Sequence, residues 1–274
     1  MQNREHDDDD EQGQRHSGAV AAVVLYESLF VYVLHHDHGR VGAPTSHEQI
    51  DLVEVLFEQY GITHTTLHDS DLKKGGLRQR FDVIVLPDQE ASALVRGIDS
   101  TRIPLPYAGG IGDLGVSAIT EFVRGGGTLV CLDGSSNFAI SRLNLPVVNV
   151  LAGEASGPQV SRFYAPGSIF GVILGGGGPR SSVTLGLPDT LQIYFANSAA
   201  FTVTGPARAL ATYPAEPLRS GYARFQERLA GKAALVEAPV GSGKVILFGF
   251  RPQFRGQTHG TFKLLFNAVL LAAP

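Results

Sequence analysis

The sequence predicts an α/β protein with a three-layer, doubly wound, mostly parallel sheet and a second half rich in strands. In the first half, short apolar runs alternate with segments whose apolar residues recur at helical spacing, which is typical of such sheets. Hydrophobic residues make up 43% of the 274 residues and charged residues only 18%, as a large buried core requires. From about residue 155, short strand-like runs separated by glycine and proline replace the alternation.

The first half is expected to begin with a strand over residues 19–26, which are apolar throughout and so suit a strand buried on both faces. A helix is expected to begin at Ser46, because Ser46 and Gln49 form a capping box, and to end before Gly61. Further strands are predicted at residues 63–67, 81–86 and 128–132.

Between the last two of these strands, residues 88–112 are rich in glycine and proline and are expected to be mostly loop. Asp113 is expected to cap the helix that follows, whose apolar face includes Ile119 and Phe122. In the second half, strands are predicted at residues 168–174, 191–195, 209–213, 233–240 and 245–250, and a buried helix at 262–271.

Composition and charge divide the chain into an acidic tail, residues 1–18, expected to be disordered, and one domain, residues 19–274. The tail holds six acidic residues against Arg4 and Arg15, so it accounts for the whole net charge of −4. A neutral body without a basic stripe argues against nucleic acid as a partner. The N-terminus does not resemble a signal peptide, and no apolar run reaches the ~18 residues of a membrane span.

Two glycine-rich segments resemble nucleotide-binding motifs only in part. Residues 241–244 (GSGK) lack the glycine six positions before the lysine and the Ser or Thr after it, since Ala238 and Val245 stand there. A hairpin turn is therefore expected at this segment. Residues 110–115 (GIGDLG) match a dinucleotide fingerprint in form, but they follow residues 103–106 (IPLP), which cannot be a central strand. No cofactor is expected.

Metal binding and thiol chemistry each have one weak candidate. Residues 35–38 (HHDH) have the spacing for a metal site, but a solvated histidine cluster is the preferred interpretation, and no metal is expected. Cys131 is the only cysteine, which excludes an internal disulfide. It lies within an apolar run and is expected to be packed in a strand. The turn after that strand begins with Asp133 instead.

Polar residues follow three of the predicted strands. Glu27 follows the first, Asp88 and Gln89 follow the third, and Asp133 with Ser135 follows the fourth. The carboxyl ends of parallel strands share one edge, where doubly wound sheets bind ligands. Carboxylates gathered there would raise one another's pKa and act as acid, base or cation partner. The alternative is that each caps a helix or accepts hydrogen bonds from loop amides.

The segment between the last strand and the last helix, residues 251–260, is unusually polar. Arg251 or Arg255 is expected to pair with Asp88 or Asp133. The arginines would then fasten the last helix through an internal ion-pair network, or they would bind a ligand carboxylate. The polar residues of this segment that we consider ligand-binding candidates are Arg251, Gln253, Arg255 and Gln257, while His259 is a catalytic candidate.

Three segments carry a resemblance to a known family: residues 81–89 (FDVIVLPDQ), 126–136 (GGTLVCLDGSS) and 249–270 (GFRPQFRGQTHGTFKLLFNAVL). They resemble the C-terminal domain of bacterial M14-family zinc carboxypeptidases. That domain is similar to the flavodoxin-like, class I glutamine amidotransferase-like fold. The likeness covers roughly residues 20–274 and implies an M14 peptidase module as a partner, in a family that is often secreted.

The chain departs from both families where their chemistry lies. An M14 zinc site requires a histidine with Glu three residues later, and no histidine of this chain has one. An amidotransferase has a nucleophilic cysteine where this chain has Asp133, and it has the Glu of a His-x-Glu pair where this chain has Thr261. The leading hypothesis is therefore a non-catalytic accessory or binding domain of a zinc-carboxypeptidase-like protein. One alternative is a hydrolase-like enzyme that uses Asp133 or Glu27 as a base, assisted by His259 or Arg255. The other is a carbohydrate- or peptide-binding module.

Overall fold

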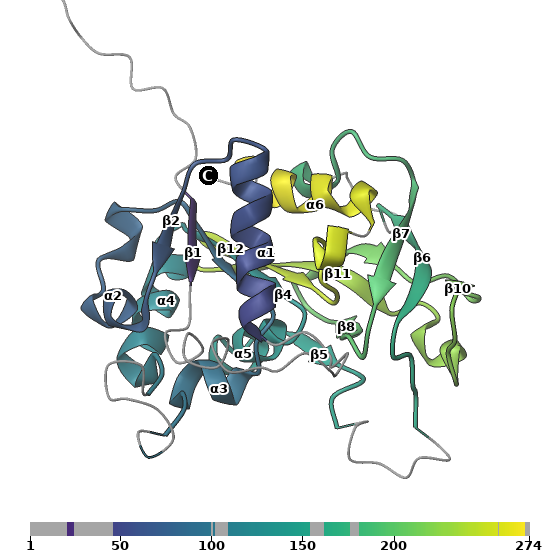
Figure 1. Ribbon diagram of the computed structural model, residues 1–274, viewed down its shortest axis with the longest axis horizontal. Coiled ribbons are helices and arrows are strands. Elements are labelled where there is room, and N and C mark those ends of the chain that lie inside the picture. The colour runs from purple at the N-terminus through teal and green to yellow at the C-terminus, as the bar shows by residue number, and fades with distance from the viewer. Residues whose placement is uncertain are drawn as a thin grey trace, which may run out of the picture.

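The computed structural model describes the backbone of residues 21–24, 46–99, 101, 109–153, 162–175, 181–256 and 258–271, and side chains from Val53 onward. The expectations for the acidic tail, for Glu27, for the histidine cluster at 35–38, for residues 103–106 and for Gln257 lie outside the described residues. One mixed sheet crosses the molecule, with helices on both of its faces (Figure 1).

The strands of the first half form the parallel part of the sheet. They lie in the order β2-β1-β3-β4, and β12 from the end of the chain adds to β4 in parallel as well. Each predicted strand of this half is found, and of the strand predicted at residues 19–26 the structure describes residues 21–24. The five parallel strands are β1 (Ala21–Val24), β2 (His64–Leu67), β3 (Val83–Leu86), β4 (Thr128–Leu132) and β12 (Gly243–Phe248).

The second half forms the antiparallel part, so the sheet is mixed. β11 pairs with β9 and β8, β9 pairs with β6, and β6 pairs with both β7 and β10. The predicted β-rich second half is therefore confirmed, although three short strands were not predicted. The antiparallel strands are β5 (Val147–Asn149), β6 (Ser168–Leu174), β7 (Thr190–Phe195), β8 (Phe201–Val203), β9 (Arg208–Thr212), β10 (Leu218–Ser220) and β11 (Ala233–Val240).

A tight hairpin joins the two parts. β11 and β12 pair antiparallel, and the pair Val240 and Gly243 closes the turn at Gly241 and Ser242. Gly241 has φ +61, a backbone conformation that favours glycine. The prediction of a hairpin turn at residues 241–244 is confirmed.

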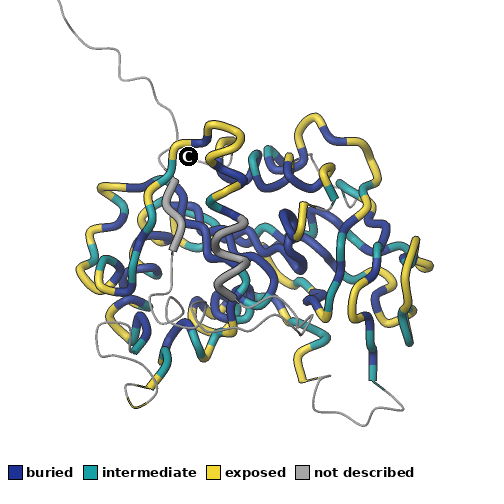
Figure 2. Tube along the Cα trace, viewed as in Figure 1, coloured by how far each residue is buried: buried dark blue, intermediate teal, exposed yellow. Residues whose placement is uncertain are grey.

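The sheet separates two hydrophobic cores, because successive strand residues point to opposite faces. Val83 and Val85 of β3 join one core, and Ile84 and Leu86 join the other. Helices α1 and α6 complete the first core, and α2, α3, α4 and α5 the second. Most of the central strands are buried (Figure 2). The helices are α1 (Ser46–Gln59), α2 (Asp69–Lys74), α3 (Ala91–Arg96), α4 (Gly112–Arg124), α5 (Ser135–Arg142) and α6 (His259–Leu270).

Some details correct the predictions. Residues 88–112 contain α3, a helix of only 6 residues, too short to show a periodic pattern. Asp113 does not cap α4, because the N-cap is Ile111 and Asp113 lies in the first turn. There its charge still suits the positive end of the helix. The last helix begins at His259, three residues before the predicted start, and most of its apolar residues are buried as expected.

Candidate functional site

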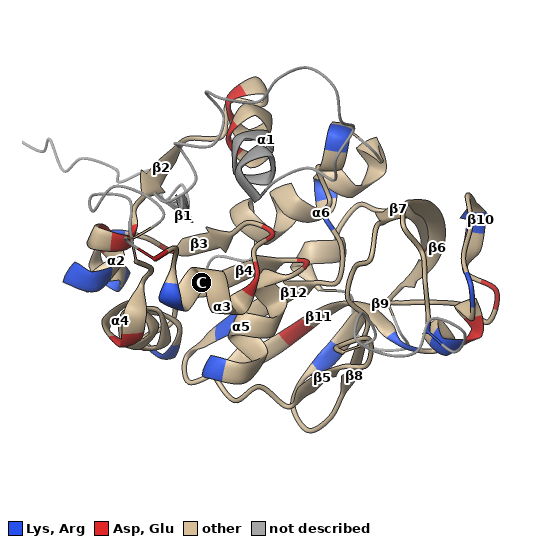
Figure 3. Ribbon diagram, turned by 60° about the horizontal axis from the view of Figure 1, so that its bottom comes forward, with Lys and Arg blue, Asp and Glu red and all other residues tan. Residues whose placement is uncertain are grey.

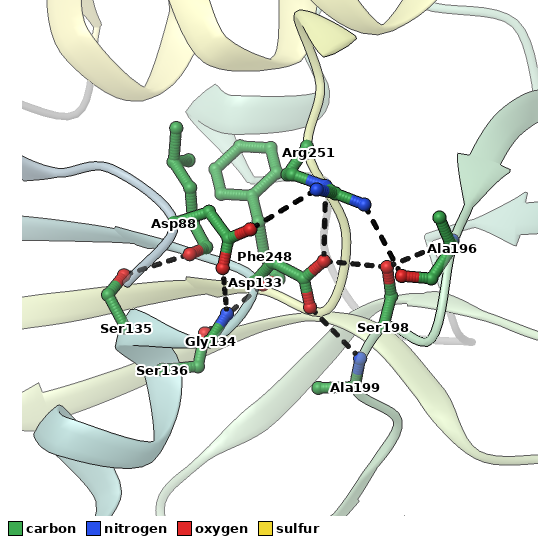
Figure 4. Close-up of polar contacts among 11 residues, drawn as sticks. Asp88, Asp133, Gly134, Ser135, Ser136, Ala196, Ser198, Ala199, Phe248 and Arg251 are labelled. Carbon is green, nitrogen blue, oxygen red and sulfur yellow. Dashed lines mark hydrogen bonds and ion pairs between the residues drawn. The ribbon is translucent and has the colours of Figure 1, made fainter. Parts of the chain in front are cut away.

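Three neighbouring parallel strands deliver charged residues to one edge of the sheet. Asp88 follows β3, Asp133 follows β4 and Arg251 follows β12, and these strands lie side by side in the order β3-β4-β12. Figure 4 shows the three side chains pointing toward one another. The predicted convergence of Asp88 and Asp133 at the carboxyl ends of the strands is therefore confirmed, while Glu27 lies outside the described residues.

One guanidinium serves both carboxylates. Nη1 of Arg251 lies 3.3 Å from Oδ2 of Asp88, and Nε lies 3.5 Å from Oδ2 of Asp133. Nη2 donates a hydrogen bond of 3.3 Å to the carbonyl of Ala196, and the ring of Phe254 lies 4.2 Å beneath the guanidinium carbon. Arg251 is only 8% exposed. Of the two predicted arginines, Arg251 makes the ion pairs, as a buried cation must to offset its desolvation.

Asp133 occupies the sharp turn between β4 and α5. Its φ of 48° is in the left-handed region, which Asp tolerates better than most residues, and its N–H donates to the carbonyl of Phe248 at 2.8 Å. Oδ2 accepts a hydrogen bond of 2.6 Å from the hydroxyl of Ser198, and Oδ1 accepts one of 3.2 Å from the N–H of Ala199. Both carboxylate oxygens are therefore engaged, and the side chain is buried.

The turn that carries Asp88 packs directly on the turn that carries Asp133. Oδ1 of Asp88 accepts a hydrogen bond of 2.9 Å from the N–H of Gly134. A Cβ atom at position 134 would lie 2.8 Å from that oxygen and 3.0 Å from the carbonyl oxygen of Gln89. Glycine therefore allows the two turns to approach closely enough to share one arginine.

The two carboxyls bind a proton more readily than an isolated Asp does. Burial raises the pKa of Asp133 to about 7, and the charge of Asp88 adds to this increase, while Arg251, Ser198 and Ala199 oppose it. Burial also raises the pKa of Asp88, against the positive charge of Arg251. A single buried guanidinium does not fully compensate two buried carboxylates, so the cluster can hold a proton near neutral pH.

Cys131 and Ser135, which lie close to Asp133 in the sequence, are both buried and not placed for attack. Cys131 is fully buried in β4, as predicted, and burial raises the pKa of its thiol. Ser135 is 1% exposed, and its hydroxyl lies 2.9 Å from the carbonyl oxygens of Leu86 and Leu132. The Ser135 hydroxyl therefore ties the turn to the ends of β3 and β4.

The remaining predicted residues divide between buried and exposed positions. Gln89 and Gln253 are buried, and Oε1 of Gln89 and both amide atoms of Gln253 have no hydrogen-bond partner among the described residues. Arg255 and His259 are exposed and take no part in the ion pairs. Arg255 lies over the ring of Phe254 with its guanidinium carbon 5.4 Å from the ring centre. Their roles as ligand-binding or catalytic residues stay predictions.

Sequence reasoning missed two residues at this site. Ser198 lies in the turn between β7 and β8, and it is 65 residues from Asp133, so only the fold brings them together. Tyr213 follows β9 and is 2% exposed, and its hydroxyl has no partner among the described residues. Burial raises its pKa well above the usual value, and the charge of Asp133 raises it further. Nothing in the local sequence around either residue indicates this role.

Metal ligands do not gather in the described part of the chain, where no group of three or more His, Cys, Asp or Glu has a suitable arrangement. Lysine, arginine and acidic residues are spread over several elements in the view of Figure 3. Among the described helices, none is both long enough and apolar enough to cross a membrane.

Comparisons with known proteins define the fold. No protein-family model matches the chain, and no curated protein does. A cytoplasmic protein from Salmonella typhimurium has a similar structure, with a TM-score of 0.54, 17% identity and coverage of 93% of this chain and 99% of its own. A protein from Bacteroides uniformis described as ThuA-like has a TM-score of 0.52, 11% identity and coverage of 95% and 94%.

A β-galactosidase from Bacillus circulans is also similar, with a TM-score of 0.53, 14% identity and coverage of 91% of this chain but only 30% of the enzyme chain. At such identities the likeness establishes the fold alone, and the chain shares the mixed α/β fold of the ThuA-like protein. None of these three proteins is described as a carboxypeptidase, so the M14 relationship stays a prediction.

Proposed function

We propose that the chain is a non-catalytic accessory or binding domain of a zinc-carboxypeptidase-like protein. One observation carries the proposal. Asp133 stands at the turn where the resembled amidotransferase fold has its nucleophile, and its carboxylate is closed in by Arg251, Ser198 and Ala199. A carboxylate with both oxygens engaged and almost no exposed surface has no free position from which to take a proton from a substrate.

The competing enzyme hypothesis requires an open site in which His259 or Arg255 assists Asp133. Both assisting residues are exposed, whereas Asp133 is 6% exposed and paired with a different arginine. The cluster therefore suits a structural role, in which Arg251 ties the start of the last segment to the turns after β3 and β4.

The link to a peptidase rests on the resemblance of residues 81–89, 126–136 and 249–270. The likeness to 30% of a β-galactosidase chain supports the accessory role, because a domain of this fold occurs there as part of a larger enzyme. We also propose that the fold is a three-layer, doubly wound arrangement of the class I glutamine amidotransferase type. The proposed partner is an M14 peptidase module.

The test compares the purified chain with its Asp133→Asn variant on glutamine, peptide and glycoside substrates. We expect no turnover that differs between the two proteins. A turnover that disappears in Asp133→Asn, while circular dichroism shows an intact fold, would contradict the proposal. The partner is tested by co-expression with the M14 module encoded in the same or a neighbouring gene, where co-elution on gel filtration is expected and separate elution argues against the link.

A further inference from the structure

A pocket of about 370 Å³ lies on the antiparallel part of the sheet, formed by strands β6, β7 and β10. It is separate from the Asp88–Asp133–Arg251 cluster and shares no residue with it. Its volume lies within the range of ~300–1,000 Å³ that is usual for small-molecule sites. Its lining combines the apolar residues Ile173 and Pro214 with the polar residues Gln192 and Arg219 around Gly171.

The outer face of the sheet forms the floor of this pocket. Phe170 and Val172 of β6 point into the hydrophobic core. Because successive residues of a strand alternate, Gly171 and Ile173 face the opposite side of the sheet. Gly171 is paired with Gln192 of β7, and Ile173 is paired with Thr190. Ile173 is 42% exposed, which is unusual for a large apolar residue in the middle of a sheet.

The backbone aims Arg219 across this floor. The pairing of β10 with β6 shifts register between Leu218 and Ser220, so Arg219 lies at a bulge. Such bulges redirect a side chain and are frequent beside functional sites. A Cβ atom at position 171 would lie 2.8 Å from Nε of Arg219. The glycine in the middle of β6 therefore leaves the space in which the guanidinium lies flat over the strand.

The guanidinium is held in place without a counter-ion. Nη1 donates a hydrogen bond of 3.0 Å to the carbonyl oxygen of Glu216. Among the described residues, no carboxylate lies within 4 Å of the Arg219 guanidinium. Arginine pairs most strongly with a carboxylate, which accepts two parallel hydrogen bonds from its planar fork. The side-chain amide of Gln192, also without a partner in the described part of the chain, lines the same pocket.

We propose that this pocket binds a small carboxylate with an apolar body. The carboxylate would pair with Arg219 and accept a hydrogen bond from Gln192, and the apolar body would cover Ile173 and Pro214. A free acid and the C-terminal end of a peptide share this chemistry. The inference goes beyond the accessory role proposed above and does not depend on it.

Calorimetric titration of the full chain tests the proposal with two matched probes. N-acetyl-leucine carries the carboxylate, and N-acetyl-leucinamide has the same apolar body without the charge. We expect saturable binding of the acid and at least about tenfold weaker binding of the amide, because a charged hydrogen-bonded pair contributes about a factor of ten or more. Equal binding of the two probes, or no saturable binding of the acid, overturns the proposal.

Variants assign the binding to the pocket. Arg219→Gln should weaken binding of N-acetyl-leucine at least about tenfold, and Arg219→Lys should give an intermediate loss, because lysine keeps the charge without the fork. Arg142→Gln is the control, since it removes an exposed charge at the end of α5, away from the pocket. If Arg219→Gln binds as well as the unchanged protein, the pocket is not the site.

A second pair of probes distinguishes the two sources of the carboxylate. If N-acetyl-alanyl-leucine binds more tightly than N-acetyl-leucine, a peptide end is the better ligand, and if it binds more weakly, a free acid is. Inorganic phosphate should compete poorly, because it lacks the apolar body. Binding of phosphate as tight as that of the acid would contradict the proposed ligand class.

Discussion

Arg251 and Arg219 are two arginines in the two halves of one sheet, and they differ in burial and in their counter-ions. Arg251, in the parallel half, is 8% exposed and pairs with two carboxylates. Arg219, in the antiparallel half, is exposed and pairs with none among the described residues. A buried charge must be compensated within the protein, whereas an exposed charge is solvated by water and can exchange that water for a ligand. The polar site that is most conspicuous in the sequence is thus closed, whereas Arg219 is an exposed cation that the described residues leave without a carboxylate.

The largest expected effect comes from removing the buried arginine. Arg251→Met should reduce the free energy of unfolding by about 3–5 kcal/mol, because it leaves two buried carboxyls without their cation. Urea denaturation monitored by circular dichroism measures the change. A loss below about 1 kcal/mol would show that Arg251 is as dispensable as an exposed arginine, and the contrast between the halves would then fail.

The next effect is a pH dependence. Because the folded state raises the pKa of Asp133 to about 7, above the ~3.9 of an unfolded chain, the folded state holds the extra proton. Stability is therefore greatest when the proton is bound and falls as the pH rises from about 4 through 7. Between pH 5 and pH 8 this contribution should be about 1–3 kcal/mol.

The difference between the unchanged protein and Asp133→Asn reports the contribution of the Asp88–Asp133 pair, because the titrating groups outside this pair are common to both. Urea denaturation at several pH values should show a slope that is present in the unchanged protein and flatter in the variant. A slope that is identical in both proteins, or that has the opposite sign, would mean that Asp133 is ionised throughout this range.

A smaller effect concerns the hydroxyl that closes the site. Ser198→Ala should cost about 1–2 kcal/mol, since it removes a donor from the buried carboxylate of Asp133. Ser141→Ala is the matched control, because the exposed Ser141 hydroxyl donates to the carbonyls of Asn137 and Phe138 one turn earlier in its own helix. Thermal unfolding of both variants should therefore show a clear decrease in Tm for position 198 only.

The smallest expected effect on stability comes from removing the exposed arginine. Arg219→Ala should change the free energy of unfolding by less than about 0.5 kcal/mol, as is usual for exposed positions. Urea denaturation under the conditions used for Arg251→Met provides a direct comparison. A large loss of stability would indicate that Arg219 is part of the structure and not an unoccupied ligand group.

The sequence predicted the parallel half in more detail than the antiparallel half. Apolar runs located β3 and β4, and because parallel strands end at one edge, the meeting of Asp88 with Asp133 followed. The pairing with Arg251 was predicted as one of several combinations. Its selection over Arg255 depends on burial, since Arg251 is buried beside both carboxylates and Arg255 is exposed, and local sequence does not determine this difference.

In the antiparallel half, the sequence located strands but not their partners. Which strands pair depends on contacts distant in the chain, and the bulge at Arg219 has no local signal. The short helices α2 and α3 were missed because 6 residues do not establish a helical period. The N-cap of α4 is Ile111, two positions before the predicted Asp113, which is within the uncertainty of helix boundaries.

The hairpin of β11 and β12 couples the stability of the two halves of the sheet. β12 bonds to β4 on one side and to β11 on the other, so a single strand belongs to both ladders. At its first residue, Gly243, a Cβ atom would lie 2.2 Å from the carbonyl oxygen of Val123, so even alanine cannot replace it without moving the end of α4. Unfolding of either half would therefore remove a hydrogen-bonding partner of β12, and we expect the described sheet to unfold as one cooperative unit.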